Sequence, residues 1–160
     1  MRAATRPRWH GPSAPGIRGL RIATLVATVL GAVATLAVIP TLPETIPTHF
    51  GVTGEADAFG PRWTLAPLAG AWLALQLLVA WLSTRPEWAQ VPGPIAGDRV
   101  DAVHREVERM LVLLGAAVAV ALGGIVLAIL VPGGIAVAAI GLAGVVLVTA
   151  LGLQRVLAAA

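Results

Sequence analysis

Residues 110–131 read MLVLLGAAVAVALGGIVLAILV and contain no charged side chain. A helix of about 20 apolar residues crosses a hydrocarbon core of about 30 Å, so this run of 22 residues is long enough. Three further runs share these properties: Ile22–Ile39, Thr64–Leu82 and Gly133–Leu153. None of the four alternates apolar and polar residues as barrel strands do. The sequence therefore predicts an all-α integral membrane bundle of four transmembrane helices with a short extracytoplasmic loop.

The composition supports a membrane protein and excludes several other classes. Of the 160 residues, 58% are hydrophobic and 12% are charged. A small soluble domain cannot hide so much apolar surface, and a disordered chain would be more polar. The absence of cysteine excludes a disulfide scaffold, a thiolate metal site and a cysteine nucleophile. The arginines form no compact patch interleaved with aromatic residues, so the expected partner is the lipid bilayer and not nucleic acid.

The distribution of arginine predicts the orientation in the membrane. Residues 1–21 carry five arginines and residues 83–109 carry four, whereas the loop 40–63 carries only Arg62. Positive charge accumulates on the cytoplasmic side of membrane proteins. We therefore expect a multi-pass protein of the plasma (inner) membrane with both termini in the cytoplasm. A cleaved signal peptide ending near Ala34 is the alternative for the first run, but the apolar residues continue through Ile39, which favours a retained anchor.

Four parts of the chain follow from this orientation. They are a cytoplasmic Arg-rich tail (1–21), a two-helix module with an outer loop at 40–63 (22–82), a cytoplasmic linker and helix (83–109), and a second transmembrane helix pair (110–160). In the linker, Gly97-Asp98 provides a helix stop and an N-cap candidate, and apolar residues then recur on one helical face. We expect this charged helix to extend the third span; the alternative is a separate helix on the membrane surface.

The predicted spans are poor in chemistry. They contain no Asp, Glu, His, Lys or Arg, which argues against a proton-coupled transporter and an intramembrane protease. Gln76 is their strongest polar residue and is expected to form an interhelical hydrogen bond. Trp72 lies midway along the second span and is expected to pack against a neighbouring helix. Small residues at four-residue spacing predict close helix contacts: Ala23, Ala27, Gly31 and Thr35; Ala66, Gly70 and Ala74; Gly115, Ala119 and Gly123.

The outer loop is the patterned part of the chain. Residues 40–63 read PTLPETIPTHFGVTGEADAFGPRW. The flanking glycines Gly51 and Gly54 predict a turn, and Thr45–Phe50 and Ala56–Phe59 predict the strands of a short hairpin. Ile46, Phe50 and Phe59 are expected to pack on the helix ends.

Acidic residues and one histidine lie close together in this loop. His49 with Glu44, Glu55 and Asp57 offers a possible divalent metal site. The other interpretation is that His49 bonds the turn and the acids are solvated. No pair of these residues has a spacing specific for metal ligands, so we predict no metal, no cofactor and no catalytic residue. The expectation is a protein that is not an enzyme.

The same loop resembles a known family. Leu42-Pro43, Ile46-Pro47, His49-Phe50, Gly54, Asp57, Gly60 and the basic Arg62 follow one membrane span, and this pattern is similar to the bacterial "domain of unknown function 1648" family of membrane proteins. That domain also forms the front of immunity proteins related to the one protecting against the sporulation-delaying-protein toxin. The resemblance covers Ile22 to about Leu82. It implies a ligand-binding or fold-defining role for Pro43, Pro47, His49, Phe50, Gly54, Asp57, Gly60 and Arg62.

Three functional hypotheses remain open at this point. The first is a non-enzymatic bacterial membrane protein that senses, or gives immunity to, an envelope-acting toxin peptide through the outer loop. The second is a structural accessory subunit of a membrane transport assembly, which would have a partner membrane protein. The third is a metal-dependent enzyme at the outer surface.

Overall fold

The computed structural model describes residues 11–51, 53–91, 95, 97–131 and 133–160. Pro132 of the predicted outer turn and the three tail arginines Arg2, Arg6 and Arg8 lie outside the described residues. The long helices are α1 (Pro15–Val38), α2 (Leu65–Ser83), α3 (Val100–Leu130) and α4 (Ile135–Ala159). All 4 are long and apolar enough to cross a membrane. The predicted all-α membrane fold of four transmembrane helices is confirmed.

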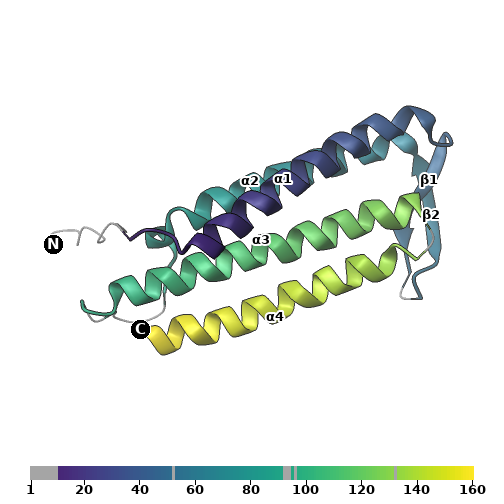
Figure 1. The fold of residues 1–160 in the computed structure, drawn as a ribbon. Helices are drawn as coiled ribbons and strands as arrows, with labels where there is room; N and C mark the ends of the chain where they lie inside the picture. Colours follow the sequence, from purple (N-terminus) through teal and green to yellow (C-terminus); the bar gives the residue numbers. More distant parts are fainter. Residues whose placement is uncertain (1–10, 52, 92–94, 96, 132) are drawn as a thin grey trace, which may run out of the picture.

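Short elements connect the helices. Strands β1 (Thr45–Phe50) and β2 (Ala56–Pro61) form an antiparallel hairpin between α1 and α2. Three 3₁₀ turns complete the connections: η1 (Ile39–Thr41), η2 (Arg62–Thr64) and η3 (Pro86–Trp88). The hairpin lies at one end of the molecule, and the start of α1 and the end of α4 lie at the other (Figure 1).

Two helix starts differ from the sequence-based expectation. α1 begins at Pro15, within the segment predicted to be a tail, because proline is well suited to the first helical position. α3 runs without a break from Val100 to Leu130, so the charged segment extends the third span and does not form a separate surface helix. Its N-cap is Arg99 and not Asp98, and no side chain caps it.

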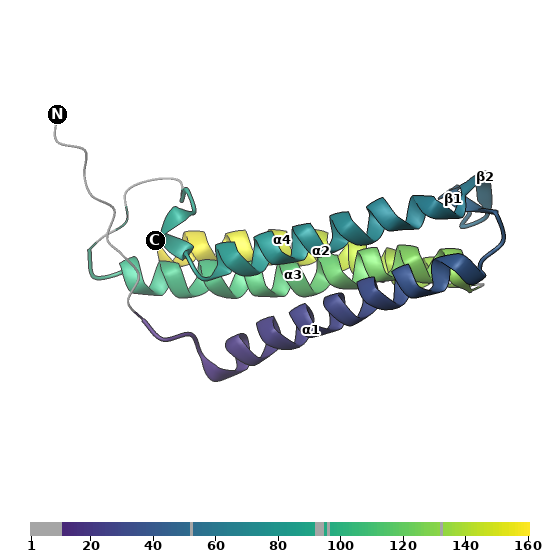
Figure 2. The ribbon, with the colours of Figure 1, turned by 90° about the horizontal axis from the view of Figure 1, so that it is seen from above.

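The four long helices differ in how many other helices they pack against. α1, α2 and α3 pack against one another, and α4 packs along α3 (Figure 1). Seen from above, α1 diverges from α3 toward its own N-terminus (Figure 2). The outer face of α4 consequently carries exposed apolar side chains such as Ile140 and Val146, which suit contact with lipid.

Glycines bring α3 and α4 into backbone contact. A Cβ atom on Gly124 of α3 would lie 2.6 Å from the Cα atom of Ala138. A Cβ atom on Gly141 of α4 would lie 2.5 Å from the Cα atom of Ala121. Small residues let helices approach closely where lipid supplies no hydrophobic drive. These two glycines were not part of the predicted small-residue stripes.

Some residues of the predicted small-residue stripes lie at contacts between helices, and others do not. The ring of Trp72 is held between α1 and α3, because a Cβ on Gly31 or Gly123 would lie 2.6 or 3.2 Å from its Cη2 atom. The prediction that Trp72 packs against a neighbouring helix is confirmed. Gly115 also faces inward, toward Gln76 and Val79 of α2. On α2, by contrast, a Cβ atom at Gly70 would meet nothing within 4 Å, whereas Ala66 of the same stripe packs against the cluster of Ile39, Ile46 and Leu65.

Buried polar groups in the spans are only partly satisfied. Gln76 is 2% exposed and its Oε1 atom has no hydrogen-bond partner among the described residues. The predicted interhelical hydrogen bond is therefore not made by this oxygen, which packs near the bare backbone of Gly115. The hydroxyls of Thr24, Thr35 and Thr149 each donate to the carbonyl four residues earlier.

Candidate functional site

The hairpin at the end of the bundle forms as the loop sequence predicts. Thr45 pairs with Pro61, and Phe50 pairs with Ala56. The turn is closed by the Gly51 N–H, which donates to the Glu55 carbonyl at 2.9 Å. Gly54 has a φ of 82°, a conformation that glycine adopts at no steric cost. The second strand extends to Pro61, beyond the predicted end at Phe59.

One side of the hairpin is anchored on the helix ends. Ile46 is 3% exposed and packs with Ile39 and Leu65. Phe50 is partly buried, but Phe59 is 62% exposed, so the prediction that Phe59 packs on the helices is wrong. Successive residues of a strand point to opposite faces, and it is Gly60 that lies opposite the buried Ile46. Phe59 therefore points the other way.

Two glycines of the loop pattern have a structural role. A Cβ atom on Gly60 would lie 2.9 Å from Cγ2 of Thr48 on the opposite strand. A Cβ atom on Gly54 would lie 3.0 Å from Cγ2 of Ile135, at the start of α4. The hairpin thus reaches from the α1–α2 connection across to α4. Gly54 and Gly60 define the fold of the loop.

Arg62 joins the two ends of the hairpin. Its Nη1 atom donates to the carbonyl of Pro40 at 3.1 Å and to that of Leu42 at 2.6 Å. Its guanidinium also lies 5.9 Å from the ring centroid of Trp63. The connection between η1 and β1, which contains Pro43, is held against the end of β2 by these bonds. Pro47 lies within β1, where it pairs with Phe59.

His49 and Asp57 form a polar pair on the exposed surface of the hairpin. The His49 Nδ1 and Asp57 Oδ1 atoms are 2.5 Å apart. Their side chains are 69% and 53% exposed, so both remain accessible to a ligand. Among the residues that the structure describes, no group of three or more His, Asp and Glu side chains is placed to hold a metal ion. The His49–Asp57 pair therefore presents hydrogen-bonding and ionisable groups on the exposed surface of the hairpin.

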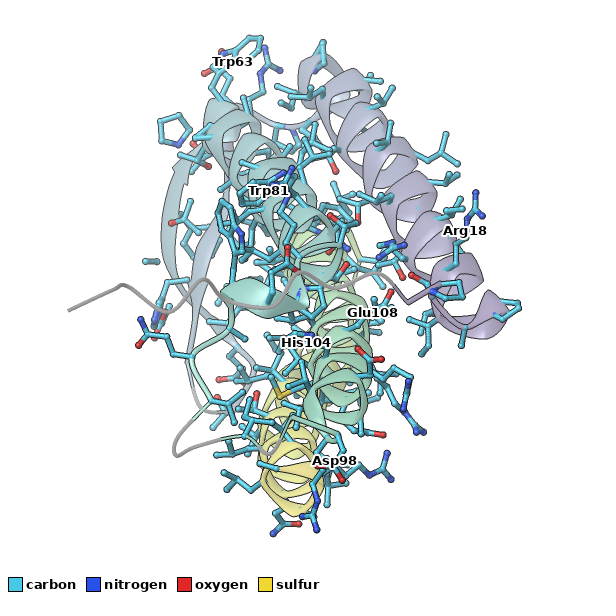
Figure 3. The ribbon with its side chains drawn as sticks, turned by 90° about the vertical axis from the view of Figure 1, so that its left-hand side faces the viewer. Arg18, Trp63, Trp81, Asp98, His104 and Glu108 are labelled. Carbon is cyan, nitrogen blue, oxygen red and sulfur yellow. The ribbon has the colours of Figure 1, made fainter. Side chains whose placement is uncertain are left out.

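A second polar cluster lies at the opposite end of the bundle and was missed by sequence reasoning. Arg21 Nη1 of α1 lies 3.3 Å from Glu108 Oε1 of α3 and 3.3 Å from the Ser83 hydroxyl at the end of α2. The hydroxyl of Ser13 donates to the same Glu108 oxygen. In Figure 3, Glu108 lies among the helices, whereas Arg18 is on the outer side of α1. The cluster ties three helices and the segment before α1 together.

A groove lies within the membrane-spanning part of the bundle. It has a volume of about 530 Å³ and lies between α1 and α3, with Trp72 of α2 on its wall. Thr28 and Trp72 line it, and neither Thr28 Oγ1 nor Trp72 Nε1 has a hydrogen-bond partner among the described residues. The hydroxyls of Thr24, Thr35 and Thr149 donate to a carbonyl of the preceding helical turn, whereas the Thr28 hydroxyl does not.

Comparison with known proteins gives one match. Residues 26–73 match the family model described as "Domain of unknown function (DUF1648)". No curated protein and no solved structure matches the chain. The matched segment runs from α1 through the hairpin into α2 and contains every loop residue named above, whereas α3 and α4 lie outside it. In its front part, the chain is thus similar to the DUF1648 family of unknown function.

Proposed function

We propose that the protein is a non-enzymatic bacterial membrane protein that senses, or gives immunity to, an envelope-acting toxin peptide. The hairpin is its receptor surface. The observation that carries the proposal is the division of roles within the hairpin. Ile46, Gly60 and Arg62 hold it on the helix ends, while His49 and Asp57 face outward as a pair.

Aromatic exposure supports a peptide as the ligand. Phe59 of β2 and Trp63, just after β2, are 62% and 61% exposed. Aromatic residues supply large contact areas in binding surfaces, and a membrane-active peptide presents apolar and charged groups together. Because the hairpin is anchored at both ends, these side chains are held in place before the ligand arrives, which lowers the entropic cost of binding.

The proposal requires the hairpin to face outward. In this orientation the protein is in the plasma membrane and both termini are cytoplasmic. The charges support it, because the described helix ends opposite the hairpin carry several arginines, including Arg21, Arg109 and Arg155, whereas Arg62 is the arginine at the hairpin end.

A protection assay tests the receptor surface. A sensitive bacterium expressing the protein is challenged with a panel of membrane-permeabilising peptides, and the inhibitory concentrations are compared with those for the empty strain. The double variant His49→Ala/Asp57→Ala should lose protection at an unchanged protein level in the membrane. Thr53→Ala, an exposed change in the turn, is the matched control and should keep it. Full protection by the double variant would exclude the pair as the recognition site.

A second candidate function is an accessory subunit of a membrane transport assembly. The observation in its favour is the exposed surface of α2 at Gly70 and Ala74, where a Cβ atom at Gly70 would meet nothing within 4 Å. A partner helix could approach closely there. Gly70→Leu should then release a partner in a pull-down, whereas Gly19→Leu, an equally open site on α1, should not. Purification of the unaltered protein without any partner would count against this function.

A further inference from the structure

Two arginines from different helices line the same groove. At the end of the bundle opposite the hairpin, α3 and α4 enclose a groove of about 200 Å³. Arg109 of α3 and Arg155 of α4 both line it. Within the described part of the chain, no ion pair is found for either guanidinium, and both residues are exposed. Glu106 is the one carboxylate among the lining residues, so the groove keeps a net positive charge.

The rest of the groove is apolar and lies on the membrane side of these charges. Its walls include Met110 and Leu113 of α3 and Leu147 and Leu151 of α4. The helices come close here because α4 has Gly152 opposite Met110; a Cβ atom at Gly152 would lie 2.7 Å from the Met110 sulfur. The groove therefore combines charged groups at its mouth with an apolar interior.

The depth of the two arginines matches the level of lipid headgroups. Arg109 directly precedes the uncharged run 110–131 of α3, and Arg155 follows the uncharged run 133–153 of α4. Charged residues at such boundaries lie where the hydrocarbon core ends and the phosphate groups begin. A guanidinium pairs with phosphate through parallel hydrogen bonds, which gives geometric specificity as well as attraction.

We propose that this groove binds an anionic phospholipid. Arg109 and Arg155 hold the headgroup phosphate, and one acyl chain lies along Met110, Leu113, Leu147 and Leu151. A free phosphate would use only the charged mouth, whereas a phospholipid uses both parts of the groove. Basic pockets between transmembrane helices are a recognised mode of anionic lipid binding.

The test is native mass spectrometry of the full-length protein in detergent with added phosphatidylglycerol or phosphatidylcholine. The unaltered protein should retain one phosphatidylglycerol in preference to phosphatidylcholine. Each arginine near an anionic surface contributes about 1 kcal/mol, so Arg109→Gln/Arg155→Gln should weaken phosphatidylglycerol binding by about 30-fold. Arg105→Gln, which removes an exposed arginine of α3 outside the groove, is the matched control and should change binding little.

Three results would overturn the proposal. They are equal binding of the two lipids, unchanged phosphatidylglycerol binding in the double variant, and complete displacement of the lipid by inorganic phosphate. Should the double variant fail to fold, Glu106→Gln serves instead. It removes the competing carboxylate and should strengthen phosphatidylglycerol binding by about fivefold, and an unchanged or weaker affinity would contradict the site.

Discussion

The pair of Arg21 and Glu108 gives the sharpest test of how the bundle is held together. The two side chains are only 15% and 5% exposed, and their charged atoms are 3.3 Å apart. Arg21→Met leaves the Glu108 carboxylate buried with the Ser13 hydroxyl as its remaining described partner. Breaking a buried ion pair costs about 3–5 kcal/mol. Because Arg21 retains some access to solvent, we expect the lower end, a loss of about 3 kcal/mol in the free energy of unfolding.

The reverse change, Glu108→Met, and the double change are expected to cost less than Arg21→Met. Glu108→Met leaves an arginine whose long side chain can extend toward the headgroups, so its cost should be about 1–2 kcal/mol. Replacing both partners by methionine should cost less than Arg21→Met alone, since no charge is then left buried. The double-mutant cycle should show a coupling energy of about 2–3 kcal/mol.

The measurement is reversible unfolding by sodium dodecyl sulfate in mixed micelles, followed by far-ultraviolet circular dichroism. Arg18→Met is the matched control, because Arg18 is exposed on the same helix, and it should change stability by less than about 0.5 kcal/mol. If the two single changes add to within about 0.5 kcal/mol, the side chains are not coupled and the reasoning is refuted.

Three further predictions concern the helices and the orientation. Gly141→Leu should lower the unfolding midpoint in the same titration far more than Gly16→Leu, because a Cβ atom at Gly141 meets the neighbouring backbone and one at Gly16 meets nothing within 4 Å; equal effects would contradict the close contact. Thr28→Val should be neutral or stabilise by up to about 1 kcal/mol, since it removes a buried hydroxyl without a hydrogen-bond partner, and a clear loss would show that the hydroxyl is engaged. In intact cells, Thr53→Cys should react with a membrane-impermeant thiol reagent and Ala89→Cys should not, and the opposite pattern would invert the proposed orientation.

The helices and the hairpin were predictable because their causes are local. In lipid, an apolar run must satisfy its own backbone, so its length and composition are enough to predict a helix. The hairpin follows from Gly51 and Gly54, which mark a turn between the short segments Thr45–Phe50 and Ala56–Phe59. The inward position of Trp72 could be inferred because a tryptophan midway along a span cannot serve as an interfacial residue.

The contacts between distant segments were not predictable from the sequence. Glu108 lies four residues after His104, which suggests an ordinary surface pair, and nothing local indicates that Arg21 meets it. Phe59 was placed inward because apolar residues favour burial, but the register with Ile46 gives that position to Gly60. The contact glycines of α3 and α4 could not be told apart from the many other small residues of the spans.

The glycine contacts between α3 and α4 also determine which movements the protein can make. Two backbones in contact cannot slide or rotate past each other without collision, so the close approach restricts relative movement of α3 and α4. On the other side of the bundle, α1 and α2 contact α3 through side chains, among them the Trp72 ring and the Arg21–Glu108 pair. The hairpin joins both sides, through Ile46 on one and the contact of Gly54 with Ile135 on the other. A displacement of the hairpin is therefore transmitted to α4 as well as to the ends of α1 and α2.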